Sequence, residues 1–267
     1  MSRPGRGPAE RGRLTTERGG GGAAHHAPVT GERPPMPPIN DIGEATREAA
    51  WWRLARLLFE RPRHEWRAEI AALSRELDDR DLRAMARKAA RCGEGAYLRV
   101  FGPGGEVPPR EITYRRLGDP GHMMAALSEH YRAFSYHPQA EDPIDHIAVE
   151  IGFAGYLRLK EAYALAVGDD DALAITRRAL DGFLRDHLGP FAFGLAARLQ
   201  ASSAPHLAGV ARRVTRRLES LGVRPAPPPH PAAAGALGGA SAELTGADDE
   251  APLNCGDGLP CGTAPRA

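Results

Sequence analysis

Apolar side chains recur every three or four residues through the middle of the chain, and no segment alternates apolar and polar positions as a half-buried strand does. The first half of this pattern predicts helices at about 42–60, 62–77 and 82–92, with a further turn or two at 94–101. The second half predicts helices that begin at Pro120, Asp142, about 170, Pro190 and Pro205. We therefore expect an all-α bundle of about eight helices without a β-sheet.

One predicted helix, from Asp142 to about Val167, is apolar on two faces. Its apolar positions include Ile144, Ile147, Ile151 and Ala154 on one face and Val149, Phe153, Tyr156 and Tyr163 on the other. A helix that is apolar around most of its circumference is buried on most of its sides. We predict that this segment is the central helix of the bundle.

Both ends of the chain differ from this middle part. Residues 1–40 contain runs of glycine and proline with scattered arginine, and residues 223–267 are rich in Pro, Ala and Gly. Neither end has enough large apolar side chains to offset the entropy of ordering it. We expect two disordered tails around one helical domain at 41–222, and roughly 180 residues are enough for one buried core.

Charge and composition exclude several classes of protein. The formal net charge of +1 provides no general attraction to nucleic acid or to a membrane surface. The sequence has no run of about 18 apolar residues that would span a bilayer. No apolar segment follows the arginines near the start, as one does in a secretory signal. We expect a cytoplasmic protein that binds no nucleic acid, inserts into no membrane and holds no cofactor or metal.

The densest group of polar candidates is Asp142-Pro143-Ile144-Asp145-His146, followed by Glu150. Asp142 can cap the predicted helix, with Pro143 at its first position and Asp145 closing a capping box. His146 and Glu150 lie one turn apart, a spacing that suits a metal ion, a mutual hydrogen bond or a binding surface. The alternative to a binding protein is therefore a metal-dependent hydrolase that uses His146 and Glu150, with Asp142 or His187.

Other motifs are less specific. Residues 102–109 form an irregular Gly- and Pro-rich stretch, and a long loop in a compact fold is usually functional or disordered. Cys255 and Cys261 form a pair that lacks the two further ligands of a zinc site. The last predicted helix carries a basic face at positions 212, 213, 216 and 217, typical of a solvated surface. A nucleic-acid adaptor that works through the last helix and the Arg-rich N-terminal tail is a third hypothesis.

Four motifs follow one another in order. They are Tyr97-Leu98-Arg99-Val100-Phe101-Gly102-Pro103-Gly104, then Pro108-Pro109 with Tyr114, then the segment from Asp142 to Glu150, then Phe183-Leu184-Arg185-Asp186-His187-Leu188-Gly189-Pro190-Phe191. This order resembles the TorD/DmsD/NarJ family of molybdoenzyme maturation chaperones, over about residues 45–222. Val100 stands where the family usually has leucine, and Arg110 stands where many members have an aromatic residue.

The resemblance implies an all-α chaperone rather than an enzyme. Such chaperones bind the catalytic subunit of a molybdopterin oxidoreductase, through its twin-arginine signal peptide or its mature part, until the cofactor is inserted. Carried across by position, the motifs imply a client-binding surface of Tyr97, Val100, Phe101, Pro108, Pro109, Tyr114, Asp142, Asp145, His146 and Glu150. A monomer and a homodimer are both compatible with the sequence.

The chemistry of a signal peptide suits these residues. Its basic start and apolar stretch require an apolar groove beside acidic groups. The apolar part is expected from Tyr97, Val100 and Phe101, and the carboxylates that bind the arginines are expected from Asp142, Asp145 and Glu150.

Overall fold

The computed structural model describes residue 36 and residues 38–115, 119–138 and 142–225. The helices of this part are α1 (Ile42–Phe59), α2 (Trp66–Glu76), α3 (Arg80–Ala89), α4 (Glu94–Phe101), α5 (Pro120–Ala133), α6 (Ile147–Val167), α7 (Asp170–Phe183), α8 (Gly189–Leu199) and α9 (Pro205–Ser220). A 3-10 turn at Glu111–Tyr114 and a π-helical turn at Leu184–Leu188 complete them, and these described residues contain no strand. The all-α prediction is confirmed. Cys255, Cys261 and most of both predicted tails lie outside the described residues.

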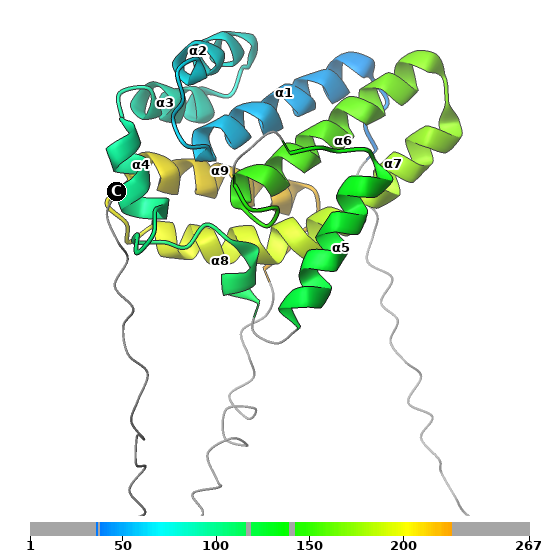
Figure 1. Ribbon diagram of the computed structural model, residues 1–267. Coiled ribbons are helices and arrows are strands. Elements are labelled where there is room, and N and C mark those ends of the chain that lie inside the picture. Colours follow the sequence, from blue (N-terminus) through cyan, green and yellow to red (C-terminus); the bar gives the residue numbers. More distant parts are fainter. Residues whose placement is uncertain (1–35, 37, 116–118, 139–141, 226–267) are drawn as a thin grey trace, which may run out of the picture.

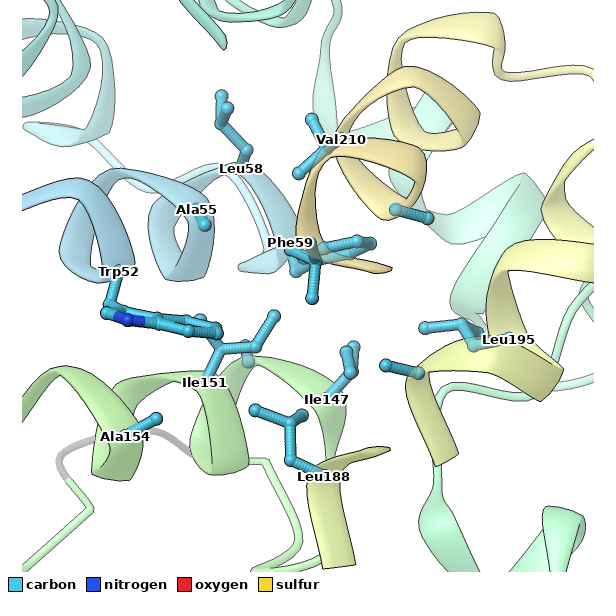
Figure 2. Packing of buried hydrophobic residues seen from close by; sticks show 14 of the residues in the cluster. Trp52, Ala55, Leu58, Phe59, Ile147, Ile151, Ala154, Leu188, Leu195 and Val210 are labelled. Carbon is cyan, nitrogen blue, oxygen red and sulfur yellow. The ribbon is translucent and has the colours of Figure 1, made fainter. Parts of the chain in front are cut away.

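The centre of the fold is the antiparallel pair of α1 and α6, which lie side by side (Figure 1). Ala45 near the start of α1 packs with Ala162 near the end of α6. Further along α1, Trp52 lies over Ile151 (Figure 2). Gly155 allows this close approach, because a Cβ at that position would lie 3.0 Å from the Cβ of Trp52. The prediction that this apolar segment forms the central helix is confirmed.

The other helices close the core around this pair. Helix α7 returns along α6 after Gly168, which caps α6 with a left-handed φ of 69°. Helices α8 and α9 pack against each other, and α3 packs against α9. Side chains from four helices and the π-helical turn therefore meet in one cluster, including Phe59, Ile147, Leu188, Leu195 and Val210 (Figure 2). None of the helices in the described ranges is long and apolar enough to cross a membrane.

The start of α6 differs from the sequence prediction. The helix begins at Ile147, and its N-cap is His146, whose Nδ1 accepts a hydrogen bond from the backbone N–H of Ala148. The prediction that Asp142 caps the helix and Asp145 closes a capping box is therefore wrong. The physical reason is competition, because the backbone around Asp145 bonds to the segment after the two prolines instead of continuing the helix.

Three smaller differences have local causes. Helix α2 begins at Trp66 rather than at Pro62. Tyr163, predicted on a buried face, is 69% exposed because α1 and α7 cover the other sides of that end of α6. The chain stays helical from α7 through the π-helical turn into α8, where the sequence predicted a separate helix that begins at Pro190. Pro190 has no N–H to donate to the carbonyl of Asp186, and the Arg115 guanidinium donates to that carbonyl instead.

Candidate functional site

The first component of the site is the short helix α4. Tyr97 and Phe101 lie one turn apart, and their rings meet edge to face with centroids 5.4 Å apart. Val100 and Phe101 are buried in the core, where Phe101 also meets Phe59. Leu98 is 39% exposed. Helix α4 is thus anchored by one face and presents Leu98, beside the half-buried Tyr97, on another.

The chain after α4 folds back on the helix. The N–H of Val107 donates to the carbonyl of Val100 at 2.9 Å, which closes the loop. Gly104 within it has a φ of 71°, a left-handed conformation that favours glycine. The Tyr114 hydroxyl donates to the carbonyl of Pro108 at 2.9 Å. The two prolines are therefore held in one position beside α4.

The segment after the prolines is bonded across the start of α6. The N–H of Ile147 donates to the carbonyl of Pro109 at 2.9 Å, and the N–H of Glu111 donates to the carbonyl of Asp145 at 2.8 Å. The Arg110 guanidinium donates through Nε to Asp145 Oδ1 at 2.8 Å. We call residues 109–111 the strap. Asp145 is fully buried, and its charge is already neutralised by the strap.

His146 connects α4 to α6. Its Nδ1 accepts from the N–H of Ala148 at 3.2 Å, so the proton is assigned to Nε2, which donates to the Tyr97 hydroxyl at 3.3 Å. Burial lowers the pKa of His146 to about 4, and the opposing effect of Asp145 is smaller. The ring is therefore neutral at neutral pH and positions Tyr97.

A buried polar group begins at the last residue of the strap, and two of its members, Glu111 and Arg115, were not predicted from the sequence. One carboxyl oxygen of Glu111 accepts from Arg115, and the other lies 3.3 Å from His187 Nδ1. Burial raises the pKa of Glu111, but His187 and Arg115 outweigh burial and the pKa is lowered overall. The spacing of Glu111 and Arg115, four residues apart, was a readable sign of this pair. No pattern in the sequence brings His187 to them.

Glu150 lies in the same group and has no exposed surface. Its carboxyl oxygens receive no donor from the backbone or from a basic side chain of the described residues, and the carboxyl faces that of Glu111. Two buried carboxyls hydrogen-bond each other only when one of them carries a proton. Burial first, and then the charge of Glu111, raise the pKa of Glu150 well above its ordinary value of 4.5. Glu150 therefore holds that proton.

The structure divides the predicted site residues into two sets. The partly exposed set is Tyr97, Pro108, Pro109, Tyr114 and Asp142, and the buried set is Val100, Phe101, Asp145, His146 and Glu150. The exposed set, together with Leu98, can touch a ligand directly. The buried set lies behind it and fixes its geometry.

The geometry does not support the hydrolase alternative. Both ring nitrogens of His146 have partners within the protein, and His187 faces Glu111 rather than His146. No group of three or more His, Cys, Asp or Glu side chains among the described residues is arranged to hold a metal ion. The basic face of the last helix is partly neutralised as well, because Arg213 pairs with Asp79 and Arg217 pairs with Glu48.

Comparison with known proteins gives one match. The family described as nitrate reductase delta subunit matches residues 60–197, just over half of the chain. This range contains α4, the strap, the start of α6 and the π-helical turn. No curated protein and no solved structure matches the chain significantly.

Proposed function

Because the chain belongs to the nitrate reductase delta subunit family of molybdoenzyme maturation chaperones, we propose that it binds the catalytic subunit of a molybdopterin oxidoreductase. We propose further that it binds the twin-arginine signal peptide of that subunit and holds the subunit until the cofactor is inserted. The family match carries this proposal, since the family is a class of non-catalytic chaperones.

The surface proposed to receive the peptide comprises Tyr97, Leu98, Pro108, Pro109 and Asp142, and we call it the α4 surface. Tyr97 bonds His146, Asp142 Oδ2 lies 3.7 Å from His146 Nδ1, and Pro109 bonds the first residue of α6. These contacts gather Tyr97, Asp142 and Pro109 around the start of α6, and Leu98 and Pro108 are their neighbours in the chain. An apolar stretch of the peptide packs on Leu98, Tyr97 and the prolines, and Asp142 attracts an arginine.

The buried network contributes by holding this surface rigid. The strap, His146 and Tyr114 fix the prolines and Tyr97 before any ligand arrives. A surface that is already ordered avoids part of the entropic cost of binding. The peptide still loses about 2–5 kcal/mol on ordering, which suits a chaperone that must release its client.

Affinity purification of the tagged protein from cells that produce a molybdoenzyme tests the chaperone function. We expect one molybdopterin oxidoreductase subunit to be retained with its twin-arginine leader uncleaved, as identified by mass spectrometry. Recovery of no such subunit, from cells shown to make one, would contradict the proposal.

Calorimetric titration with the leader peptide tests the α4 surface. We expect Leu98→Asp to weaken binding by at least about tenfold, because it places a charge where the apolar stretch packs. Ile175→Asp is the matched control, since Ile175 is an exposed apolar residue on α7, 52% exposed. Phe101→Ala is a poorer test, because emptying a buried aromatic position costs about 3–5 kcal/mol of stability. Equal affinities of both Asp variants and the wild type would exclude Leu98 from the surface.

A further inference from the structure

A second site lies on another face of α4, where α3 ends and α9 begins. A cavity of about 330 Å³ is lined there by Lys88, Arg91, Cys92, Arg99, Ser203 and His206, among others. Residues of α4 on this side are Ala96 and Arg99, whereas Tyr97 and Phe101 turn toward the site already described. The chemistry of the cavity is different, because it combines a thiol, an imidazole and three cations.

The thiol and the imidazole lie next to each other. Cys92 Sγ is 3.8 Å from His206 Nδ1 and 3.5 Å from the carbonyl oxygen of Lys88, both within the range of a sulfur hydrogen bond. Cys92 is a free thiol with a partly exposed side chain. Burial, and then the charge of Lys88, lower the pKa of His206. The imidazole is therefore neutral at neutral pH, and with its own proton on Nε2 it has a free lone pair on Nδ1 that faces the thiol.

The cations at the mouth of the cavity are exposed. The side chains of Lys88 and Arg91 form no hydrogen bond or ion pair with another described residue. Arg99 interacts electrostatically with Glu106. The Glu106 carboxylate accepts hydrogen bonds from the N–H and the hydroxyl of Ser203 at the edge of the cavity. Positive charge thus exceeds negative charge around Cys92. Such a mouth raises the local concentration of anions.

We propose that Cys92 is a site of mixed-disulfide formation with small anionic disulfides, which Lys88, Arg91 and Arg99 attract to the cavity. The proton of the Cys92 thiol passes to His206 Nδ1, and the sulfur attacks one sulfur of the disulfide. The disulfide's S–S bond breaks as the Cys92 S–S bond forms, and the other half leaves as a thiolate. The proton then passes from His206 to solvent. The thiol is oxidised and the incoming disulfide is reduced, so no other oxidant is required.

The test compares two reagents on the full chain with Cys255→Ser and Cys261→Ser, so that Cys92 alone reacts. Dithionitrobenzoate carries a carboxylate on each half, and dithiodipyridine is neutral. We expect Lys88→Glu with Arg91→Glu to lower the ratio of the anionic to the neutral rate by about tenfold. Arg132→Glu, an exposed charge reversal on α5, is the matched control and should leave the ratio unchanged. Equal ratios in all three proteins would overturn the proposal.

Salt and His206 provide measurements that do not depend on the folding of the double variant. In the protein without charge substitutions, the rate of reaction with the anionic reagent should fall as the salt concentration rises. The rate with the neutral reagent should stay constant, because salt screens only charged groups. His206→Gln should slow both reagents by the same factor. A ratio independent of salt, or an adduct that mass spectrometry places away from Cys92, would also overturn the proposal. The proposed client binding does not depend on any of these outcomes.

Discussion

The two ends of α6 both bury charged side chains, but in opposite balance. Toward its C-terminal end, Glu161 accepts from Arg158 at 2.6 Å and from Arg177 at 2.8 Å. At the other end, the carboxyls of Glu111 and Glu150 meet, and Glu150 has no basic partner within hydrogen-bonding distance. The first end has two arginines for one carboxylate, whereas the second holds two carboxyls, of which Glu150 has a raised pKa that favours its neutral form.

This difference separates two uses of buried charge. The arginine-rich end ties α6 to α7 and, through a bond from Arg177 to the carbonyl of Ile39, to the segment before α1. The carboxyl-rich end lies directly behind the strap and the α4 surface, whose residues we propose for client binding. Buried charge at the arginine-rich end stabilises the fold. Buried charge at the carboxyl-rich end makes the residues that support the proposed site sensitive to pH.

The largest expected effect is at the arginine-rich end. Glu161→Gln leaves Arg158, which is 1% exposed, without its nearest counter-charge. Breaking a buried ion pair by removing one partner costs about 3–5 kcal/mol, because the remaining charge stays desolvated. We expect a loss of that size in the free energy of unfolding, measured by urea denaturation followed by circular dichroism.

Glu69→Gln is the control for this measurement. Glu69 also pairs with two arginines, Arg63 and Arg53, but both arginines are half or more exposed. A surface pair contributes at most about 1 kcal/mol. Similar losses for Glu69→Gln and Glu161→Gln would show that burial does not distinguish the two ion networks.

An intermediate effect is expected at the carboxyl-rich end, and it depends on pH. Glu150 keeps its proton in the folded protein and loses it in the unfolded chain above its ordinary pKa of 4.5. The folded state therefore binds more protons, and stability falls as the pH rises, by at most about 1.4 kcal/mol per pH unit. Glu150→Gln keeps a donor for Glu111 and removes this slope. As the pH rises from about 5 to 7, the urea midpoint of the variant should fall less steeply, or rise more steeply, than that of the wild type.

The difference between variant and wild type isolates Glu150. The lowered pKa values of His130, His146 and His206 make stability rise with pH in both proteins, because the unfolded imidazoles bind more protons. The lowered pKa of Glu111 acts below this window. Glu76→Gln on the exposed side of α2 is the matched control. Parallel pH profiles of the wild type and Glu150→Gln would show that Glu150 is ionised in the folded state.

The sequence predicted the helices and much of the core because both depend on local periodicity. Trp51, Leu54 and Leu58 follow each other at helical spacing in the predicted helix at 42–60, and all three are buried. Periodicity did not reveal the start of α6, because the capping pattern at Asp142 competes with hydrogen bonds from the strap, about 35 residues earlier in the chain. A capping pattern considers only residues that are neighbours in the sequence, so it cannot account for a hydrogen-bond partner this far away in the chain.

The same reason limits the prediction of the site. Tyr97, Phe101 and His146 were expected together, and the structure brings them into contact. Sequence patterns did not show which of these side chains face solvent. Leu98 was overlooked because nothing in α4 alone marks it as exposed, and the burial of Glu150 depends on the 3-10 turn that covers it.

The smallest expected effect compares two tyrosines, one that contacts the N-cap of α6 and one in the middle of that helix. Tyr97→Phe removes the partner of His146 Nε2, and Tyr156→Phe removes a bond of 2.9 Å to the carbonyl of Phe134. Each loss should cost about 1 kcal/mol of stability. Only Tyr97→Phe should also weaken the binding of the leader peptide, because His146 then no longer fixes the aromatic ring on the α4 surface. If calorimetric titration gave the two variants the same peptide affinity, the bond between Tyr97 and His146 would serve the fold alone, and the contrast between the two ends of α6 would be one of stability rather than of function.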